Sequence, residues 1–333
     1  MDSSFSYGVG LQTYTGGMWD GVKPTLEELG AYVRRAEELG YTTIWHTDRL
    51  LPTVPPGYST AWYEPLTTLS SIIPYIKKAG VGTSAVVLPL RNPVILAKQL
   101  ATMDVLSGGR LKVGIAMGWS QQEYAATGTD FKRRSAIYSE YIRVLSMLLT
   151  GEKVSFQGRY VSISDVEIRP HPVQRPRPPI YMGGGGPWVG VDDTMREKLE
   201  LRVFSRIAEM ADGWIAGARI DASTAQRYIQ LLRKLISERG RDPAKFTILN
   251  QNFVYVYGVS GSQEELKSKI NKIVPTPFDA ATKVWIVGEK QDVAARIDKM
   301  VNAGVQHFIV WPVGNHLPTI EYLAEEIFPK YVK

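Results

Sequence analysis

Residues 80–118 read GVGTSAVVLPLRNPVILAKQLATMDVLSGGRLKVGIAMG, and this stretch decides the fold class. Two short apolar runs, residues 81–88 and 111–118, enclose a longer amphipathic segment that is typical of a helix. Gly80 stands directly before the first run, and Gly108 and Gly109 precede the second. Because glycine commonly ends helices, this order predicts parallel strands joined by helices.

The same alternation of short apolar runs and amphipathic helices continues along the chain. Pro24 and the acidic pair Glu27 and Glu28 mark the first turn of a helix that starts at Thr25 and runs to about Leu39. Eight strands are predicted, at residues 7–13, 42–48, 81–88, 111–118, 179–183, 213–216, 246–257 and 306–312.

Eight strand–helix units favour a closed barrel over an open, doubly wound sheet. An open sheet of the dinucleotide-binding kind needs G-x-G-x-x-G directly after its first strand. Gly8 and Gly10 lie inside the first predicted strand, and no third glycine follows at the required spacing. The sequence therefore predicts an α/β fold, a (β/α)8 TIM barrel with insertions at the C-terminal face.

One domain spanning residues 1–333 is expected, since no tandem repeat or low-complexity tract divides the chain. Long loops in a compact fold are commonly functional, and in a barrel they are expected at the C-terminal face, where active sites lie. A small hairpin is predicted within residues 154–163. Insertions interrupt the alternation near residues 51–60, 151–178, 187–197 and 276–288.

The composition excludes several kinds of chemistry. The 333 residues include 39 Lys and Arg against 33 Asp and Glu, and this net charge of +6 is spread along the chain, so no nucleic-acid partner is expected. The absence of cysteine excludes disulfides, thiolate nucleophiles and Cys-ligated metals. The four histidines form no ligand pair, so no metal site is expected. We recognise no signal peptide or membrane span, which predicts a cytoplasmic protein.

Polar side chains end the second predicted strand, in the sequence Trp45-His46-Thr47-Asp48-Arg49. Strand alternation sends His46 and Asp48 to one side and Arg49 to the other. A carboxylate, an imidazole and a guanidinium at the end of a barrel strand can bind a polar ring edge or move a proton. The alternative is structural: Asp48 caps the next loop and pairs with Arg49.

Glycine-rich and small residues end three other strands. The run Tyr181-Met182-Gly183-Gly184-Gly185-Gly186 lets backbone N–H groups approach an anion, although it is also typical of a hinge. After the fourth strand, Trp119 and Gln122 offer a flat surface and hydrogen-bonding groups, or else Trp119 belongs to the core. In the third strand, the small residues Gly82-Thr83-Ser84-Ala85 leave room for a flat ring or for a bulky helix.

Taken together, these segments resemble the bacterial luciferase-like family of flavin- and deazaflavin-dependent barrel enzymes. The resemblance runs in order over nearly the whole chain. Its motifs are WHTDR, VGTSAVVLPLRNPVILAKQLATMDVLSGGRLKVGIAMGW with the following QQEYAATGTDFKRR, RPHPVQRPRPPIYMGGGG, ADGWI and AGVQHFIVWP.

The resemblance implies that a cofactor ring lies across the C-terminal end of the barrel. Its face would rest on a backbone bulge in the third strand, at a non-prolyl cis peptide that matches Ser84–Ala85. The glycines after the fifth strand would bind the cofactor phosphate, and Asp48 would lie close to the ring, as in the coenzyme F420 branch. The implied cofactor site comprises Asp48, Thr83, Ser84, Ala85, Trp119, Gln122, Tyr181, Met182, Gly183, Gly184 and Gly185.

Two departures limit what the resemblance implies about the reaction. The sugar-phosphate and secondary-alcohol dehydrogenases of the F420 branch carry a histidine base where this chain has Arg49, and a glutamate where it has Trp119. Sugar-phosphate oxidation is therefore disfavoured. The expected catalytic residues are Asp48, Arg49 and His46, with His46 either a displaced base or a residue packed beneath the ring.

The implied activity is that of an oxidoreductase exchanging a hydride between coenzyme F420 and an unidentified small organic substrate. One alternative is an FMN-dependent monooxygenase that uses reduced flavin and O2, with a reductase supplying the reduced cofactor. A second alternative is a flavin-binding barrel without turnover. The family resemblance also implies a homodimer. Basic residues available for the anionic tail of F420 are Arg177, Arg196, Lys198 and Arg202.

Overall fold

The structure, a computed structural model, describes residues 5–11, 13, 23–52, 62–186, 188, 190–273 and 277–332. Strands and helices alternate along the chain, as the sequence predicts. Most of the predicted insertion at residues 51–60 lies outside the described residues. None of the described helices is both long and apolar enough to span a membrane.

Eight parallel strands of the described chain close into a barrel, which confirms the predicted fold class. The ring closes because the first strand pairs with both the second and the last, for example Gly8 with Thr43 and with Ile309. The barrel strands are β1 (Ser6–Gly10), β2 (Thr43–His46), β3 (Gly80–Thr83), β5 (Leu111–Ala116), β8 (Ile180–Gly183), β9 (Gly213–Ala216), β10 (Thr247–Val256) and β12 (His307–Pro312). A two-residue strand, β4 (Val86–Val87), follows β3 along the chain and pairs with β5.

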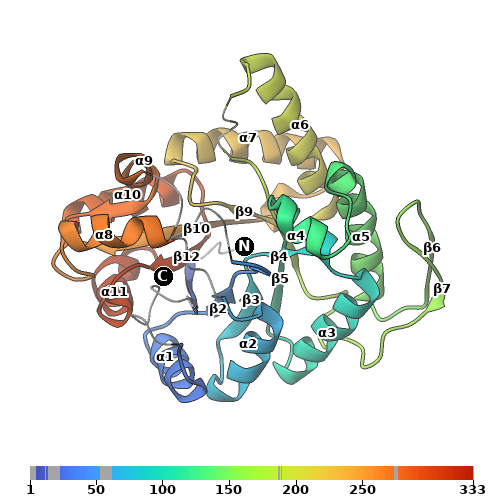
Figure 1. Cartoon of the computed structure of the whole chain (residues 1–333), viewed down its shortest axis with the longest axis horizontal. Coiled ribbons are helices and arrows are strands. Elements are labelled where there is room, and N and C mark those ends of the chain that lie inside the picture. The colour runs from blue at the N-terminus through green and yellow to red at the C-terminus, as the bar shows by residue number, and fades with distance from the viewer. Residues whose placement is uncertain are drawn as a thin grey trace.

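Helices surround the barrel on all sides (Figure 1). The first of them starts where the sequence predicts, because Thr25 and Glu28 form a reciprocal capping box, and it buries Leu29 and Val33 against the strands. The helices are α1 (Leu26–Glu38), α2 (Pro65–Ile72), α3 (Pro93–Leu106), α4 (Gln121–Ala126), α5 (Arg134–Leu148), α6 (Asp193–Met210), α7 (Ala222–Glu238), α8 (Gln263–Ile273), α9 (Phe278–Val284), α10 (Lys290–Asn302) and α11 (His316–Tyr322).

Large side chains fill the inside of the barrel. Trp45 of β2 is fully buried there, together with Tyr181, Ile309 and Trp311. A Cβ atom at Gly8 or at Gly82 would lie 2.4 Å from the Trp45 indole. Two neighbouring strands therefore need glycine so that this one ring can fit between them.

The insertion at residues 151–178 lies at the end of the barrel opposite to the expected one. It contains the predicted hairpin, β6 (Val154–Gln157) and β7 (Ser162–Val166), which projects from the ring of helices (Figure 1). The insertion leads from the end of α5 to the start of β8, and in a parallel barrel such a connection belongs to the N-terminal face. The expectation of a C-terminal position is therefore wrong for this segment.

The insertion near residues 276–288 does lie at the C-terminal end. Its strand β11 (Ile286–Gly288) pairs with residues 254–256, the last part of β10, beyond the region where β10 pairs with its barrel neighbour β9. The C-terminal end of the barrel, called the mouth below, is thus extended on the β10 side.

Candidate active site

The structure brings the predicted site segments to the same end of the barrel. Each follows the C-terminal end of its strand: Asp48 and Arg49 follow β2, Ser84 follows β3, and Trp119 follows β5. The glycines of residues 183–186 end β8 and begin the connection to α6. Because all these strands are parallel, the segments meet at the mouth.

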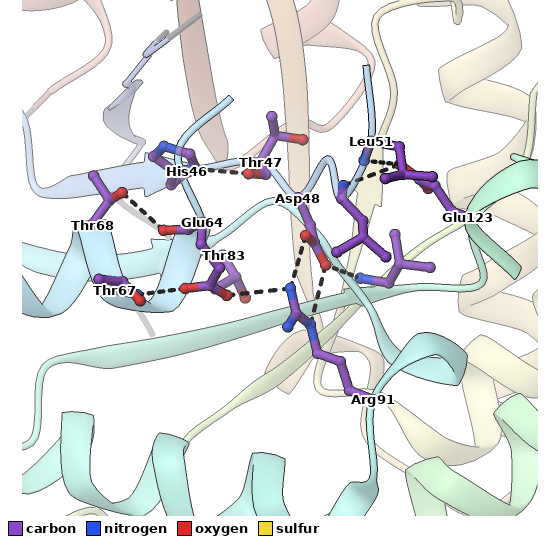
Figure 2. A network of polar contacts seen from close by, with 12 residues as sticks. His46, Thr47, Asp48, Leu51, Glu64, Thr67, Thr68, Thr83, Arg91 and Glu123 are labelled. Atoms are coloured by element: carbon purple, nitrogen blue, oxygen red, sulfur yellow. Dashed lines mark hydrogen bonds and ion pairs between the residues drawn. The ribbon is translucent and has the colours of Figure 1, made fainter. Parts of the chain in front are cut away.

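Asp48 is held by a segment that lies 39 to 43 residues further along the chain (Figure 2). Its carboxylate accepts hydrogen bonds from the Val87 backbone N–H at 2.9 Å and from two Arg91 nitrogens at 2.8 and 3.3 Å. Arg91 also pairs at 3.3 Å with Glu64, which caps α2 through the N–H of Thr67. Burial raises the pKa of Asp48, while Arg91 and the Val87 N–H act in the opposite direction.

These contacts test the structural alternative for Asp48, in which the carboxylate caps the next loop and pairs with Arg49. The carboxylate joins the end of β2 to β4 and to the start of α2, so it does organise neighbouring loops. The partner expected from the sequence is wrong, however, because the ion pair is formed with Arg91 instead of Arg49.

Arg49 and Trp119 form a stacked pair. The Arg49 guanidinium carbon lies 4.6 Å from the centre of the Trp119 indole, an arrangement stabilised by cation–π attraction. Trp119 is 59% exposed, so the alternative that places it in the core is wrong. Glu123, which is buried, accepts hydrogen bonds from the N–H groups of Leu50 and Leu51 at 3.0 and 3.2 Å, and so holds the segment carrying Arg49 against α4. Gln122 is exposed on the same helix.

His46 is fully buried and both of its ring nitrogens are hydrogen-bonded. Nδ1 lies 2.7 Å from the Thr47 carbonyl oxygen, which can only accept, so Nδ1 carries the proton. Nε2 lies 3.0 Å from the hydroxyl of Thr13, which also accepts from the Tyr63 N–H; in the neutral imidazole with its proton on Nδ1, Nε2 accepts from this hydroxyl. Burial lowers the pKa of His46 to about 4. This geometry favours a neutral imidazole packed beneath the site over a displaced base.

The third strand contains the expected bulge. The Ser84–Ala85 peptide bond is cis, as the family resemblance implies. The segment is anchored on three sides: the Ser84 N–H donates to the His46 carbonyl at 2.7 Å, and the Thr83 hydroxyl donates to the Gly114 carbonyl at 2.7 Å. On the third side, the Ser84 hydroxyl donates to Oε1 of Gln251, on β10, at 2.5 Å.

The need for glycine at position 82 comes from packing inside the protein and not from a bound ring, the explanation proposed from the sequence. The space above its Cα is occupied by the Trp45 indole, so the flat ring that it accommodates belongs to the protein itself. The signal for a ligand in this strand therefore lies with Ser84 and Ala85, at the mouth, and not with Gly82.

The glycines of the loop at residues 183–186 differ in how much space a Cβ atom would have. A Cβ at Gly184 would lie 2.9 Å from the Val203 side chain, and Gly185 has φ +75° with its Cβ position 2.8 Å from Phe204. In contrast, a Cβ at Gly183 would meet its nearest atom at 3.5 Å, and nothing lies within 4 Å at Gly186. Packing against α6 thus explains Gly184 and Gly185, whereas a Cβ at Gly183 would make only ordinary contacts and Gly186 borders open space.

The two residues before the glycines lie deeper. Tyr181 packs inside the barrel, and burial raises its pKa to about 12. Met182 is 1% exposed and belongs to the core that includes the surrounding helices. Strand alternation accounts for this division, and it leaves the glycines as the part of the segment that reaches the mouth.

The basic residues considered for an anionic tail divide between the two ends of the barrel. Arg177 pairs with Asp212 at 2.5 Å, and both residues directly precede barrel strands, so they lie at the N-terminal end. The expectation for Arg177 is wrong for this reason. Arg196, Lys198 and Arg202 lie on α6, which follows the glycine loop.

Two features of the mouth are not predicted from the sequence. One is Gln251, whose polar side chain interrupts a largely buried strand. The other is an aromatic wall, in which the Trp62 ring lies 6.3 Å from that of Trp311 and 6.1 Å from that of His46. A polar residue inside β10 was the available signal for Gln251, but only the closed barrel shows that it faces Ser84.

Residues 4–280 match the family described as luciferase-like monooxygenase. The chain belongs to this family. Among luciferase-like relatives, the F420-dependent glucose-6-phosphate dehydrogenase of Amycolatopsis mediterranei is 28% identical over 334 aligned positions, covering 93% of this chain and 97% of that protein. The FMNH(2)-dependent dimethylsulfone monooxygenase of Pseudomonas putida is 38% identical over 96 residues, covering 28% of this chain and 26% of that one.

A solved structure supports the fold of this luciferase-like chain. The coenzyme F420-dependent tetrahydromethanopterin reductase of Methanopyrus kandleri superimposes with a TM-score of 0.73 at 18% identity, covering 98% of this chain and 99% of that one. At this identity the likeness concerns the fold alone.

Proposed function

We propose that this luciferase-like protein is an oxidoreductase that exchanges a hydride between coenzyme F420 and a small organic substrate. The observation that carries the proposal is the bulge at Ser84 and Ala85, fixed by β2, β5 and β10 at the mouth of the barrel. The F420-dependent relative that aligns over 93% of the chain supports this choice of cofactor.

The residues at the mouth fit a flat cofactor with an anionic tail. The bulge offers a rigid backbone surface. Gly186 borders open space and Gly183 has no close neighbour above its Cα, so backbone N–H groups of this loop can approach a phosphate. Arg196, Lys198 and Arg202 lie on α6, the helix that follows that loop, and would supply positive charge for the tail, although Arg196 already pairs with Asp193 at 2.9 Å. When bound, the deazaflavin supplies the carbon that accepts or donates the hydride.

The chain's own residues have distinct proposed roles. Asp48 holds the segment after the bulge through Val87 and Arg91 and would lie close to the ring, while Ser84 and Ala85 would support the ring face. Arg49, held flat on Trp119, would stabilise negative charge on the substrate. Trp119 and Gln122 would line the pocket, and Trp62 and Trp311 would form its apolar wall.

An FMN-dependent monooxygenase is the second candidate. It is favoured by the 38% identity to the dimethylsulfone monooxygenase, although this likeness covers only 28% of the chain. Flavin and deazaflavin rings share their shape and their carbonyl edge, so the bulge and the glycine loop suit both cofactors.

Titration of the purified protein with F420 and with FMN, followed by fluorescence quenching, tests the proposal. We expect saturable quenching by F420 and at least tenfold weaker binding of FMN. Arg159→Ala, in the hairpin at the opposite end of the barrel, serves as the control and should bind F420 like the wild type. Tighter binding of FMN than of F420 would overturn the proposal and favour the monooxygenase. Bleaching of the bound cofactor's visible band by candidate substrates would then distinguish an enzyme from a flavin-binding barrel without turnover.

A further inference from the structure

Gln251 occupies the middle of β10 and differs from its neighbours in exposure. Side chains alternate along the strand, and Leu249 two residues earlier packs inside the barrel. Asn250 and Asn252 point to the other side, where their amide nitrogens donate to the carbonyls of Ala216 and Val284. Both asparagines are buried, whereas Gln251 is partly exposed. Gln251 therefore reaches from the barrel interior into the mouth.

One end of the Gln251 amide is already fixed. Its Oε1 accepts the hydroxyl of Ser84 at 2.5 Å, and Ser84 is itself tied to the His46 carbonyl through its backbone N–H. The hydrogen bond from Ser84 thus occupies the amide oxygen of Gln251 and orients the whole side chain. The amide nitrogen, with two N–H donors, makes no hydrogen bond to any residue in the described ranges.

We propose that Gln251 Nε2 donates a hydrogen bond to a carbonyl oxygen of the cofactor ring, and that Ser84 orients the amide for this contact. The inference rests on the proposed function. It favours the ring over the substrate because the amide is bonded to Ser84, the first residue of the bulge on which the ring face would rest. A donor at this position stabilises the negative charge that ring carbonyls share in the reduced cofactor. Gln251 would therefore affect cofactor affinity and the cofactor's reduction potential.

Three variants test the contact without requiring a known substrate. Gln251→Leu removes the donor, and we expect it to weaken F420 binding about tenfold and to shift the absorption maximum of the bound cofactor. Ser84→Ala keeps the Gln251 donor but removes the hydroxyl that orients the amide. We therefore expect a smaller loss of F420 affinity, about threefold. Gln251→Glu keeps an acceptor for Ser84 but puts a carboxylate next to the ring carbonyl. Its F420 affinity should be lowest at pH 8 and should recover as the pH falls and the carboxyl is protonated, while wild-type affinity changes much less.

Asn250→Ala is the matched control, because it removes an amide from the adjacent position of the same strand on the opposite side. It should bind F420 within twofold of the wild type. Melting temperatures identify variants that fail to fold, and the pH dependence of Gln251→Glu gives a second readout that a purely structural role would not produce.

The outcomes separate this inference from the proposed function. If wild-type protein fails to bind F420, the proposed function fails, and this inference fails with it. If wild-type protein binds F420 and folded Gln251→Leu binds it with unchanged affinity and spectrum, only the contact proposed here is overturned. A loss of affinity in Gln251→Leu without any pH dependence in Gln251→Glu would also contradict a hydrogen bond to the ring.

Discussion

The Asp48 carboxylate is occupied by Arg91 and by the Val87 N–H, and its side chain is only 4% exposed. A buried carboxylate of this kind depends on its partner, because removing one member leaves the other without compensation for its lost hydration. Arg49 points away and stacks on Trp119. Asp48 and Arg49 are neighbours in sequence but belong to different networks.

A double-mutant cycle measures this separation. Asp48→Asn and Arg91→Gln should each lower the free energy of unfolding by about 3 kcal/mol, and the double variant should lose clearly less than the sum. Asp48→Asn combined with Arg49→Ala should be additive within about 0.5 kcal/mol. Urea unfolding of the wild type and the five variants gives these values. Additive losses for Asp48 and Arg91 would contradict the network.

The same residues differ in their effects on function. Asp48→Ala should weaken cofactor binding, by up to about 2 kcal/mol, because the Val87 N–H and Arg91 lose their acceptor next to the bulge. Arg49→Ala should leave cofactor affinity nearly unchanged and lower turnover. Cofactor titration and, once a substrate is found, steady-state rates check both expectations. Weaker cofactor binding in Arg49→Ala would mean that Arg49 contacts the cofactor.

The sequence predicts the residues of this region better than their partners. The run from Trp45 to Arg49 is recognisable because polar residues end an apolar strand. Arg91 lies 43 residues after Asp48, and no spacing rule joins positions that far apart. Gln251 lies 167 residues from Ser84, so their hydrogen bond is a product of barrel closure.

At the scale of elements, the glycine loop combines a packing requirement with a binding surface. Gly184 and Gly185 lie against Val203 and Phe204 of α6, whereas Gly183 leaves room for a methyl group and Gly186 borders open space. The four glycines are indistinguishable in the sequence, and only the position of α6 in the fold shows which of them are required for packing. The cis peptide at Ser84–Ala85, in contrast, follows from the family resemblance and is confirmed.

Substitutions in the loop should separate stability from binding. In Gly183→Ala the new methyl group makes an ordinary contact at 3.5 Å, so the melting temperature should change little while F420 affinity falls about tenfold. Gly184→Val should lower both, because its side chain meets Val203 at 2.9 Å and Ile207 at 3.2 Å. Thermal unfolding and cofactor titration measure the two effects. Unchanged affinity in Gly183→Ala would move the phosphate site elsewhere.

At the scale of the whole molecule, two fully buried imidazoles link stability to pH. Burial lowers the pKa of His46 to about 4 and that of His307 well below its ordinary value, with the nearby charge of Lys112 adding to the effect at His307. In the pH range between the folded and unfolded pKa values, the unfolded chain binds more protons than the folded one. Stability is therefore complete above about pH 6.5 and decreases as the pH falls towards 4.

The variant His46→Gln tests this linkage. For His46 alone, the free energy of unfolding should fall by about 2 kcal/mol between pH 7.5 and pH 5. His46→Gln should be less stable than the wild type at pH 7.5 but should lose about 2 kcal/mol less on acidification. Urea unfolding at the two pH values gives both numbers. Equal losses in the two proteins would mean that burial does not lower the pKa of His46 in the folded protein.

The pairing of β1 with β12 brings the two ends of the described chain together. The ring of Phe5 lies 5.9 Å from that of Phe328 and 5.2 Å from that of Tyr331. The turn between β6 and β7 is far from the mouth, at the other end of the barrel. The order of segments can therefore be rotated: a chain that begins at Arg159, runs through a short linker from the old C-terminus to the old N-terminus and ends at Gly158 should close the same ring. Such a circular permutant should bind F420 with wild-type affinity, since the cut severs no strand that reaches the site.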